Sequence, residues 1–111
     1  MSAHGTGTPY NDAMEAVAIA RVFGAGRVPV NSIKGAIGHT LGAAGAFEAV
    51  LCVEVLRTGL IPPTAGLVTV DPACEGLDLV RGEARRRRVD VTVSTSSGFA
   101  GTNTALVLGR S

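Results

Sequence analysis

The spacing of apolar residues predicts a helix and a short strand in the first third of the chain. Apolar positions repeat at helical intervals between Asp12 and Gly24, where glycine ends the pattern. The segment Asp12–Glu15 has the form of a capping box, so its two acidic residues are expected to be structural caps rather than acids or bases. The run Val28–Ile33 then predicts a strand, with Pro29 at its beginning or at a sheet edge.

A second helix is predicted from His39 to about Arg57, where Gly59 stops it. The stretch is apolar on nearly every side, because Glu48, Glu54 and Arg57 are its only charged residues. A helix of this kind is normally buried between two layers. The carboxylate of Glu48, in the middle of an apolar helix, therefore needs a cationic or hydrogen-bonding partner.

Three strands are predicted in the second half, at Leu77–Val80, Val89–Ser96 and Thr104–Leu108. The basic run Arg85–Arg88 lies between the first two and is expected to be a solvated loop. At the other end, Met1–Ala3 leads directly into the first motif and leaves no room for a strand before it. The order helix, strand, helix, strand, strand, strand is typical of part of a layered α/β domain.

Composition narrows the class of protein. The 111 residues are enough for one small domain, and a hydrophobic content of 46% excludes a disordered tail. The formal net charge of +1 argues against nucleic acid or a membrane surface as the main partner. The longest apolar stretch is interrupted by Glu48 and is too short to span a membrane, and no secretory signal is present, so a cytoplasmic location is expected.

Two cysteines occur, and neither has the setting of a reactive thiol. Cys52 falls in the apolar helical stretch and is expected to be a small core residue. Cys74 lies in the loop Asp71–Glu75 without a nearby base and is expected to be inert. Their spacing does not match a metal site, so no metal is expected.

The only two histidines each lie in a glycine-containing motif. His4 opens the segment His4–Thr8, and His39 closes the segment Lys34–His39. Glycine next to a histidine allows a ligand or the backbone to approach closely, because glycine has no Cβ. Two imidazoles with a lysine and a carboxylate indicate acid–base or carbonyl-polarising chemistry, but no residue of the chain has the pattern of an activated nucleophile.

Four blocks of the chain stand in the order found in one known family. They are His4–Pro9 with Asp12, Lys34 with Gly38–His39, Gly42–Gly45 with Glu48, and Gly98–Phe99 with Gly101–Asn103. With them the chain resembles the C-terminal part of β-ketoacyl-acyl carrier protein synthases, the condensing enzymes of fatty-acid and polyketide assembly. The resemblance implies a thiolase-like α/β fold of two similar halves, of which residues 1–111 would be most of the second. The family's nucleophilic cysteine lies in the first half.

The resemblance also implies roles for the histidine blocks. His4 and His39 would be a pair of neutral imidazole donors that stabilise negative charge on a thioester oxygen. A helix beginning at His39 would disfavour protonation of its ring. Lys34 and Glu48 would form an ion pair that orients the two histidines, and an ordinary structural salt bridge is the alternative for this pair.

The remaining family positions concern the substrate. Thr6 and Thr8 match residues whose hydroxyls hold the phosphopantetheine arm of an acyl carrier protein, and no other cofactor is implied. Phe99 matches the gate of the acyl pocket, and its N–H would form half of an oxyanion hole. Turn stabilisation by the threonines and core packing of Phe99 are the structural alternatives.

The gate loop departs from the family pattern. Its residues are Gly98, Phe99, Ala100 and Gly101. Ala100 replaces a glycine, and its methyl group would restrict the backbone if a positive φ were needed there. Before the loop, Thr95–Ser97 stands where the family usually has Asn-Ser-Phe.

Two functions from different classes remain open. In the first, the chain is part of a ketosynthase, inactive alone and completed in cis or in trans by a cysteine-bearing half, with the acyl carrier protein as partner. In the second, it is a non-catalytic, truncated piece that at most binds a partner. A plain thiolase is a weaker alternative, because the His4 and Lys34–His39 motifs point away from it.

Two expectations concern the surface. The run Arg85–Arg88 is a candidate for docking the acidic carrier protein, beside its interpretation as a solvated loop. Without a facing half, the second helix would expose apolar surface. The isolated chain is therefore expected to be marginally stable, and to form homo- or hetero-oligomers or to aggregate.

Overall fold

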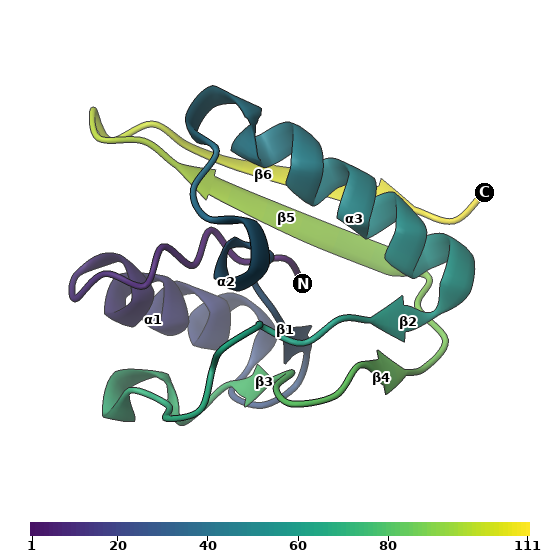
Figure 1. Cartoon of the computed structure of the whole chain (residues 1–111), viewed down its shortest axis with the longest axis horizontal. Helices are drawn as coiled ribbons and strands as arrows, with labels where there is room; N and C mark the ends of the chain where they lie inside the picture. The colour runs from purple at the N-terminus through teal and green to yellow at the C-terminus, as the bar shows by residue number, and fades with distance from the viewer.

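The computed structural model describes residues 1–111 (Figure 1). In chain order, the elements are α1 (Asn11–Phe23), β1 (Pro29–Val30), α2 (Lys34–Ile37), the 3₁₀ turn η1 (Leu41–Ala43), α3 (Ala44–Thr58), β2 (Leu60–Ile61), the 3₁₀ turn η2 (Pro72–Cys74), β3 (Asp78–Leu79), β4 (Arg85–Arg86), β5 (Val91–Ser97) and β6 (Asn103–Gly109). Every predicted helix and strand region contains an element of the expected type.

The first residues of the chain form the centre of the sheet. Ser2 makes parallel bridges to Asn31 on one side and to Ser94 of β5 on the other. Beyond these neighbours, β1 pairs with β3 in parallel and β5 pairs with β6 in an antiparallel hairpin. No strand precedes α1, as expected, but backbone hydrogen bonds to both flanking segments hold Met1–Ala3 extended between them.

The two long helices lie against different parts of this sheet. α3 packs across the hairpin of β5 and β6 and lies above it in Figure 1. α1 lies beside β1 and η2. Ile19 of α1 is buried against Ala3 and Val30, and on the α3 side Val55 is buried with Ile61. These two small apolar clusters hold the layers together.

The predicted capping box at the start of α1 is not formed. The helix begins at Asn11, its N-cap Tyr10 makes no side-chain cap bond, and Asp12 accepts a hydrogen bond from the N–H of Gly7 instead. The Glu15 carboxylate accepts hydrogen bonds from the N–H groups of His4 and Gly5, in the loop before the helix. The expected capping role of both acidic residues was wrong, because neighbouring loop amides compete for the carboxylates.

The second predicted helix is divided. The short helix α2 precedes His39, and α3 begins only at Ala44, after the turn η1. Leu41, at the start of η1, has a positive φ of 52°, so the chain changes direction there before α3 can begin. The predicted C-terminus is correct, since Gly59 ends α3 in a left-handed conformation.

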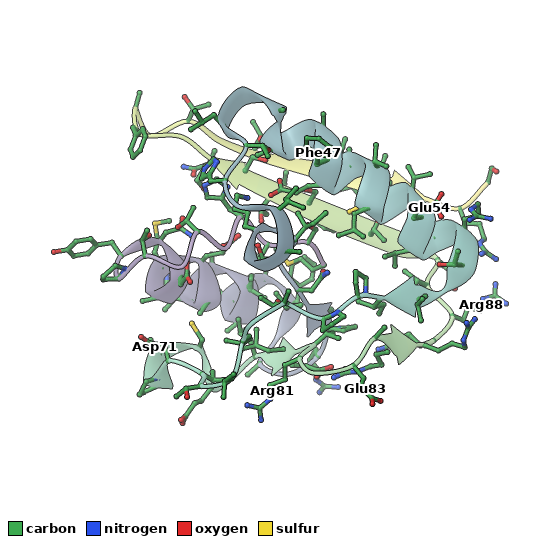
Figure 2. All side chains as sticks on the ribbon, in the orientation of Figure 1. Phe47, Glu54, Asp71, Arg81, Glu83 and Arg88 are labelled. Carbon is green, nitrogen blue, oxygen red and sulfur yellow. The ribbon has the colours of Figure 1, made fainter.

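The basic run is also partly ordered, against expectation. Arg85 and Arg86 form β4, which pairs with β2, and Arg85 makes an ion pair with Asp78 at 2.5 Å. Arg88 pairs with Asp90 at 3.0 Å, so two of the four positive charges have acidic partners. Arg88 lies at the periphery of the molecule, beyond the end of α3 (Figure 2).

One face of α3 lacks cover, as the sequence predicts. Phe47, Val50 and Val53 are exposed by 49%, 63% and 51%, while Glu48, Cys52 and Val55 on the opposite side are buried. Figure 2 shows Phe47 on the side of α3 away from β5. None of the helices has the length and the apolar character needed to cross a bilayer.

Candidate functional site

The loop that carries His4 is held by a carboxylate from α1. Glu15 Oε1 accepts a hydrogen bond from the N–H of His4 at 2.8 Å, and Oε2 accepts one from the N–H of Gly5 at 2.9 Å. Gly5 has a φ of +45°, and a Cβ there would lie 2.7 Å from the Cβ of Ser32. Glycine is thus required at this turn, which directly follows the extended segment Met1–Ala3 and His4.

The rings of the two histidines lie close together. Their ring centroids are 5.5 Å apart and the rings are nearly perpendicular, at 85°. His4 is buried, and this burial, together with the positive charge of Lys34, lowers its pKa below 6.5. The imidazole of His4 is therefore neutral at neutral pH and can donate a hydrogen bond without carrying charge.

The tautomer of His39 follows from its own backbone contact. Its Nδ1 accepts a hydrogen bond from the N–H of Leu41 at 3.0 Å, so in the neutral ring the proton is on Nε2. The expected position of His39 at a helix N-terminus was wrong, because α3 begins at Ala44. The hydrogen bond from Leu41, at the start of η1, orients the His39 ring instead.

A buried ion pair lies behind the histidines. Lys34 Nζ donates to Glu48 Oε1, and both side chains are almost completely excluded from solvent, at 6% and 0% exposure. Ser96 of β5 donates to the other carboxylate oxygen at 3.4 Å. The sequence prediction that Glu48 needs a cationic partner is confirmed, and Lys34 is that partner.

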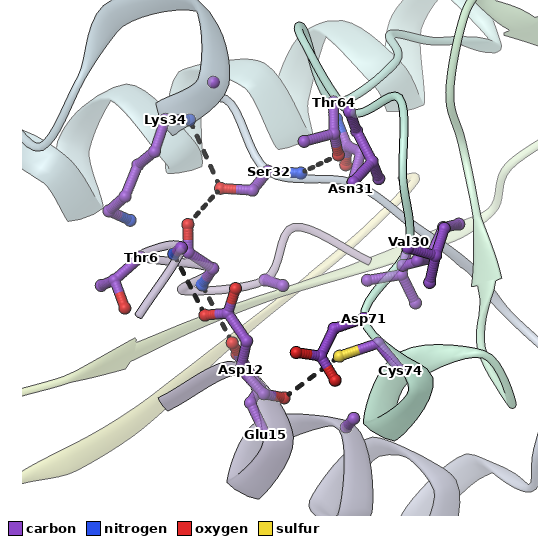
Figure 3. A pocket seen from close by; sticks show the side chains of 18 of the residues that line it. Thr6, Asp12, Glu15, Val30, Asn31, Ser32, Lys34, Thr64, Asp71 and Cys74 are labelled. Atoms are coloured by element: carbon purple, nitrogen blue, oxygen red, sulfur yellow. Dashed lines mark hydrogen bonds between the residues drawn. The ribbon is translucent and has the colours of Figure 1, made fainter. Parts of the chain in front are cut away.

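A cavity of about 630 Å³ opens between the His4 loop, α1 and the loop that follows β2 (Figure 3). Thr6, Thr8, Lys34 and His39 contribute to its wall. Its floor is apolar and comes from the central strands and from α1, with Ala3, Ala16, Ile19, Val30, Leu77 and Leu79. Such a lining suits an extended ligand with apolar stretches and a few hydrogen-bonding groups.

The two threonines are partners of each other within the chain. Their hydroxyl oxygens are 2.8 Å apart, and both side chains lie on the outer part of the His4 loop. One hydroxyl donates to the other, which leaves lone pairs and one O–H free for a ligand. This contact fits the structural interpretation as turn stabilisation as well as the substrate role implied by the resemblance.

The gate loop does not line this cavity. Phe99 is fully exposed at the tip of the β5–β6 hairpin, so the alternative of core packing for Phe99 is wrong within this chain. Gly101 has a φ of +77°, whereas Ala100 keeps a negative φ. The methyl group of Ala100 therefore strains nothing in this conformation of the loop.

Neither cysteine resembles a nucleophile. Cys52 is buried in α3, as the sequence predicts, and its burial raises the pKa of the thiol. Burial also raises the pKa of Cys74, with the carboxylates of Asp12 and Asp71 as the next causes. Both thiols stay protonated at neutral pH, and no cluster of three or more histidine, cysteine or acidic side chains could hold a metal ion.

Three residues of the site were missed in the sequence. Glu15 was interpreted as a cap, while Thr95 and Ser96 were noted only as part of a departure from a family pattern. In the structure, the Thr95 hydroxyl donates to Glu15 and the Ser96 hydroxyl donates to Glu48. Consecutive small hydroxyl side chains on a strand were the available signal, but their partners are 80 and 48 residues away.

The chain is similar to known proteins over nearly its whole length. A family model described as the C-terminal domain of β-ketoacyl synthase matches residues 1–68. The actinorhodin polyketide putative β-ketoacyl synthase 1 of Streptomyces coelicolor is 47% identical over 110 residues, which is 97% of this chain and 23% of the relative. The 3-oxoacyl-(acyl-carrier-protein) synthase 2 of Coxiella burnetii is 47% identical over 99% of this chain and 27% of the relative.

Solved structures confirm the thiolase-like α/β fold. A β-ketoacyl synthase from Burkholderia phymatum superimposes with a TM-score of 0.93 at 42% identity, over 99% of this chain and 27% of the other. A ketosynthase determined in complex with a type II polyketide acyl carrier protein gives a TM-score of 0.91 at 34% identity, over 97% and 27%. The chain thus spans about a quarter of the length of its relatives.

Proposed function

The chain belongs to the β-ketoacyl synthase family, and we propose that it supplies the histidine, lysine and glutamate part of a condensing active site. A second part, a cysteine-bearing half in the same chain or in a separate one, would complete the enzyme. We call this chain together with that half the complete synthase.

The observation that carries the proposal is the pair of nearly perpendicular imidazoles next to the extended segment Met1–Ala3. His39 has its free N–H on Nε2, and the lowered pKa of His4 keeps its ring neutral. The buried Nδ1 of His4 has no hydrogen-bond partner within the chain. Two fixed imidazole N–H donors are suited to an oxygen that becomes negatively charged during reaction.

The proposed reaction is a decarboxylative Claisen condensation. A malonyl thioester loses carbon dioxide, and the electrons of the broken C–C bond form an enolate whose oxygen accepts hydrogen bonds from His4 and His39. The enolate carbon then attacks the carbonyl of an acyl group held on the cysteine of the other half. A new C–C bond forms, the cysteine leaves as a thiolate, and the product is a β-ketoacyl thioester.

Lys34 and Glu48 act behind the histidines. Their mutual ion pair neutralises both charges where water is almost absent. A free ammonium group would lower the pKa of His4 further, while a free carboxylate would repel the enolate. The pair therefore leaves no net charge of its own beside the enolate.

The substrate would arrive on the phosphopantetheine arm of an acyl carrier protein. The exposed hydroxyls of Thr6 and Thr8 and the apolar floor of the cavity support this assignment. The arm is the substrate carrier, so the chain needs no resident cofactor. The exposed face of α3, with Phe47, Val50 and Val53, is the surface we assign to the cysteine-bearing half.

A non-catalytic role is the second candidate. It is favoured by the protonated state of both thiols in the chain, which leaves it without a nucleophile of its own. In that case the α3 face would bind a partner, and the histidines would be relics of an active ancestor.

One assay separates the two candidates. The complete synthase is incubated with an acyl-carrier thioester and with malonyl carrier thioester, and cysteine acylation and release of carbon dioxide are measured separately. We expect His4→Ala and His39→Ala to abolish decarboxylation while acylation of the cysteine persists. Absence of decarboxylation by the wild-type complete synthase would favour the non-catalytic role.

A further inference from the structure

The carboxylate of Glu15 accepts more than the two loop amides. The Thr95 hydroxyl donates to Glu15 Oε1 at 2.6 Å, and this is the same oxygen that accepts the N–H of His4. The N–H of His4 also lies 3.2 Å from Thr95 Oγ1. The hydroxyl of Thr95 thus donates to the carboxylate and accepts from the histidine backbone at once.

Thr95 is itself fixed in the sheet. It belongs to β5, and its backbone N–H donates to the carbonyl of Ser2 at 3.1 Å. Its side chain therefore connects three segments that are distant in sequence: the N-terminal segment at His4, β5, and Glu15 on α1. No other side chain of the chain contacts both the His4 amide and Glu15.

The local geometry makes this contact decisive for the position of His4. The carboxylate of Glu15 has three hydrogen-bond partners within the chain: the N–H groups of His4 and Gly5 and the hydroxyl of Thr95. A donor at Oε1 from the opposite side limits its rotation. If the carboxylate turned, the Gly5 amide would lose its acceptor and the His4 amide would keep only the longer contact to Thr95.

We propose that Thr95 is a positioning residue for His4, acting through Glu15. The inference rests on the proposed role of His4 in decarboxylation, and it concerns a residue at which this chain departs from the asparagine usual in the family. Thr95 touches no reacting atom. It holds the His4 backbone, and with it the imidazole ring, in position next to the ring of His39.

The test compares three substitutions in the complete synthase. Thr95→Val has almost the same shape and lacks the hydroxyl, while Thr95→Ser keeps the hydroxyl. Thr104→Val, on the exposed face of β6, is the matched control, because the Thr104 side chain makes no hydrogen bond. Decarboxylation, cysteine acylation, thermal unfolding and hydrogen exchange at the His4 and Gly5 amides are measured for each.

Thr95→Val is expected to slow decarboxylation by about 10- to 100-fold, the range typical of a misplacement near 1 Å. Cysteine acylation should stay unchanged, the melting temperature should fall only slightly because one hydrogen bond to a carboxylate is lost, and Thr95→Ser and Thr104→Val should behave as wild type. An unchanged decarboxylation rate in Thr95→Val would overturn the proposal. A loss of cysteine acylation as large as the loss of decarboxylation, together with a large fall in the melting temperature, would also overturn it. That result would indicate a merely structural role.

Hydrogen exchange keeps the proposal separate from the proposed function. If the wild-type complete synthase releases no carbon dioxide, the catalytic role of the site fails, and exchange alone decides the positioning role. Faster exchange at His4 and Gly5 in Thr95→Val then supports the restraint, and unchanged exchange refutes it.

Discussion

Lys34 Nζ donates to Glu48 Oε1 in a part of the molecule from which water is almost excluded. The two residues lie 14 positions apart, on α2 and α3, so the ion pair joins the short helix before His39 to the long helix after it. Ser96 adds a contact from β5 to the same carboxylate. A single pair of charges thus ties three elements to one point behind the histidines.

Breaking this pair should be costly. Glu48→Ala leaves the Lys34 ammonium buried without a counter-charge, and we expect the free energy of unfolding of the complete synthase to fall by about 3–5 kcal/mol. The double variant Lys34→Met with Glu48→Leu removes both charges and should cost clearly less. Urea denaturation measures both values. Glu54→Gln is the control, since the exposed pair of Glu54 with Arg57 should contribute nothing measurable.

Stability should depend on pH through His4. Burial lowers the pKa of His4 in the folded state below 6.5, so the unfolded chain binds the proton more readily. The stabilisation that results from this difference in pKa is fully present above pH 6.5. It is lost as the pH falls through the pKa of His4 in the folded state. Denaturation midpoints between neutral and mildly acidic pH measure the effect. His4→Gln should flatten this part of the profile, and a profile identical to wild type would contradict the assignment.

The uncovered face of α3 should control association. We expect the isolated chain to oligomerise or aggregate, because Phe47, Val50 and Val53 expose apolar surface. Val50→Glu should shift the isolated chain toward monomer in sedimentation and weaken its binding to the cysteine-bearing half. Val22→Glu on α1, where the valine is 73% exposed, is the matched control and should change neither. A wild-type monomer at micromolar concentration that melts cooperatively would contradict this prediction.

Both thiols should react slowly with alkylating reagents at neutral pH. The raised pKa values of Cys52 and Cys74 keep the thiols protonated, and the thiolate is the reactive form. Mass spectrometry after timed exposure to iodoacetamide would show modification that accelerates as the pH rises.

The isolated chain should also show no condensation activity, and turnover by pure material would refute that expectation.

Phe99 should matter for substrate and not for folding. Its side chain is fully exposed at the hairpin tip, so Phe99→Ala is expected to leave the melting temperature unchanged. If the loop is the gate implied by the family resemblance, the same variant should alter the dependence of cysteine acylation on acyl-chain length. Ala100→Gly offers a second probe, since it loosens the loop without removing the ring. Identical chain-length profiles for all three proteins would argue against a gate.

Local sequence signals located the elements but not all of their limits. Helical spacing, Gly24 and Gly59 were sufficient for α1 and for the end of α3, because these features act within one or two turns. The break between α2 and α3 was missed, since the positive φ of Leu41 has no signal in an apolar run. The bridges of Ser2 to Asn31 and Ser94 were missed because these partners are distant in sequence.

By itself, the sequence determined the α/β class, the two histidine motifs and the need of Glu48 for a cation. These depend on periodicity, on glycine and on the cost of an unpaired buried charge, all of which are local or general. Only the tertiary structure decided that Glu15 holds the His4 loop, that Thr95 holds Glu15, and that the rings stand perpendicular 5.5 Å apart. A hydrogen bond between residues 80 positions apart exists only after the sheet has brought its donors and acceptors together.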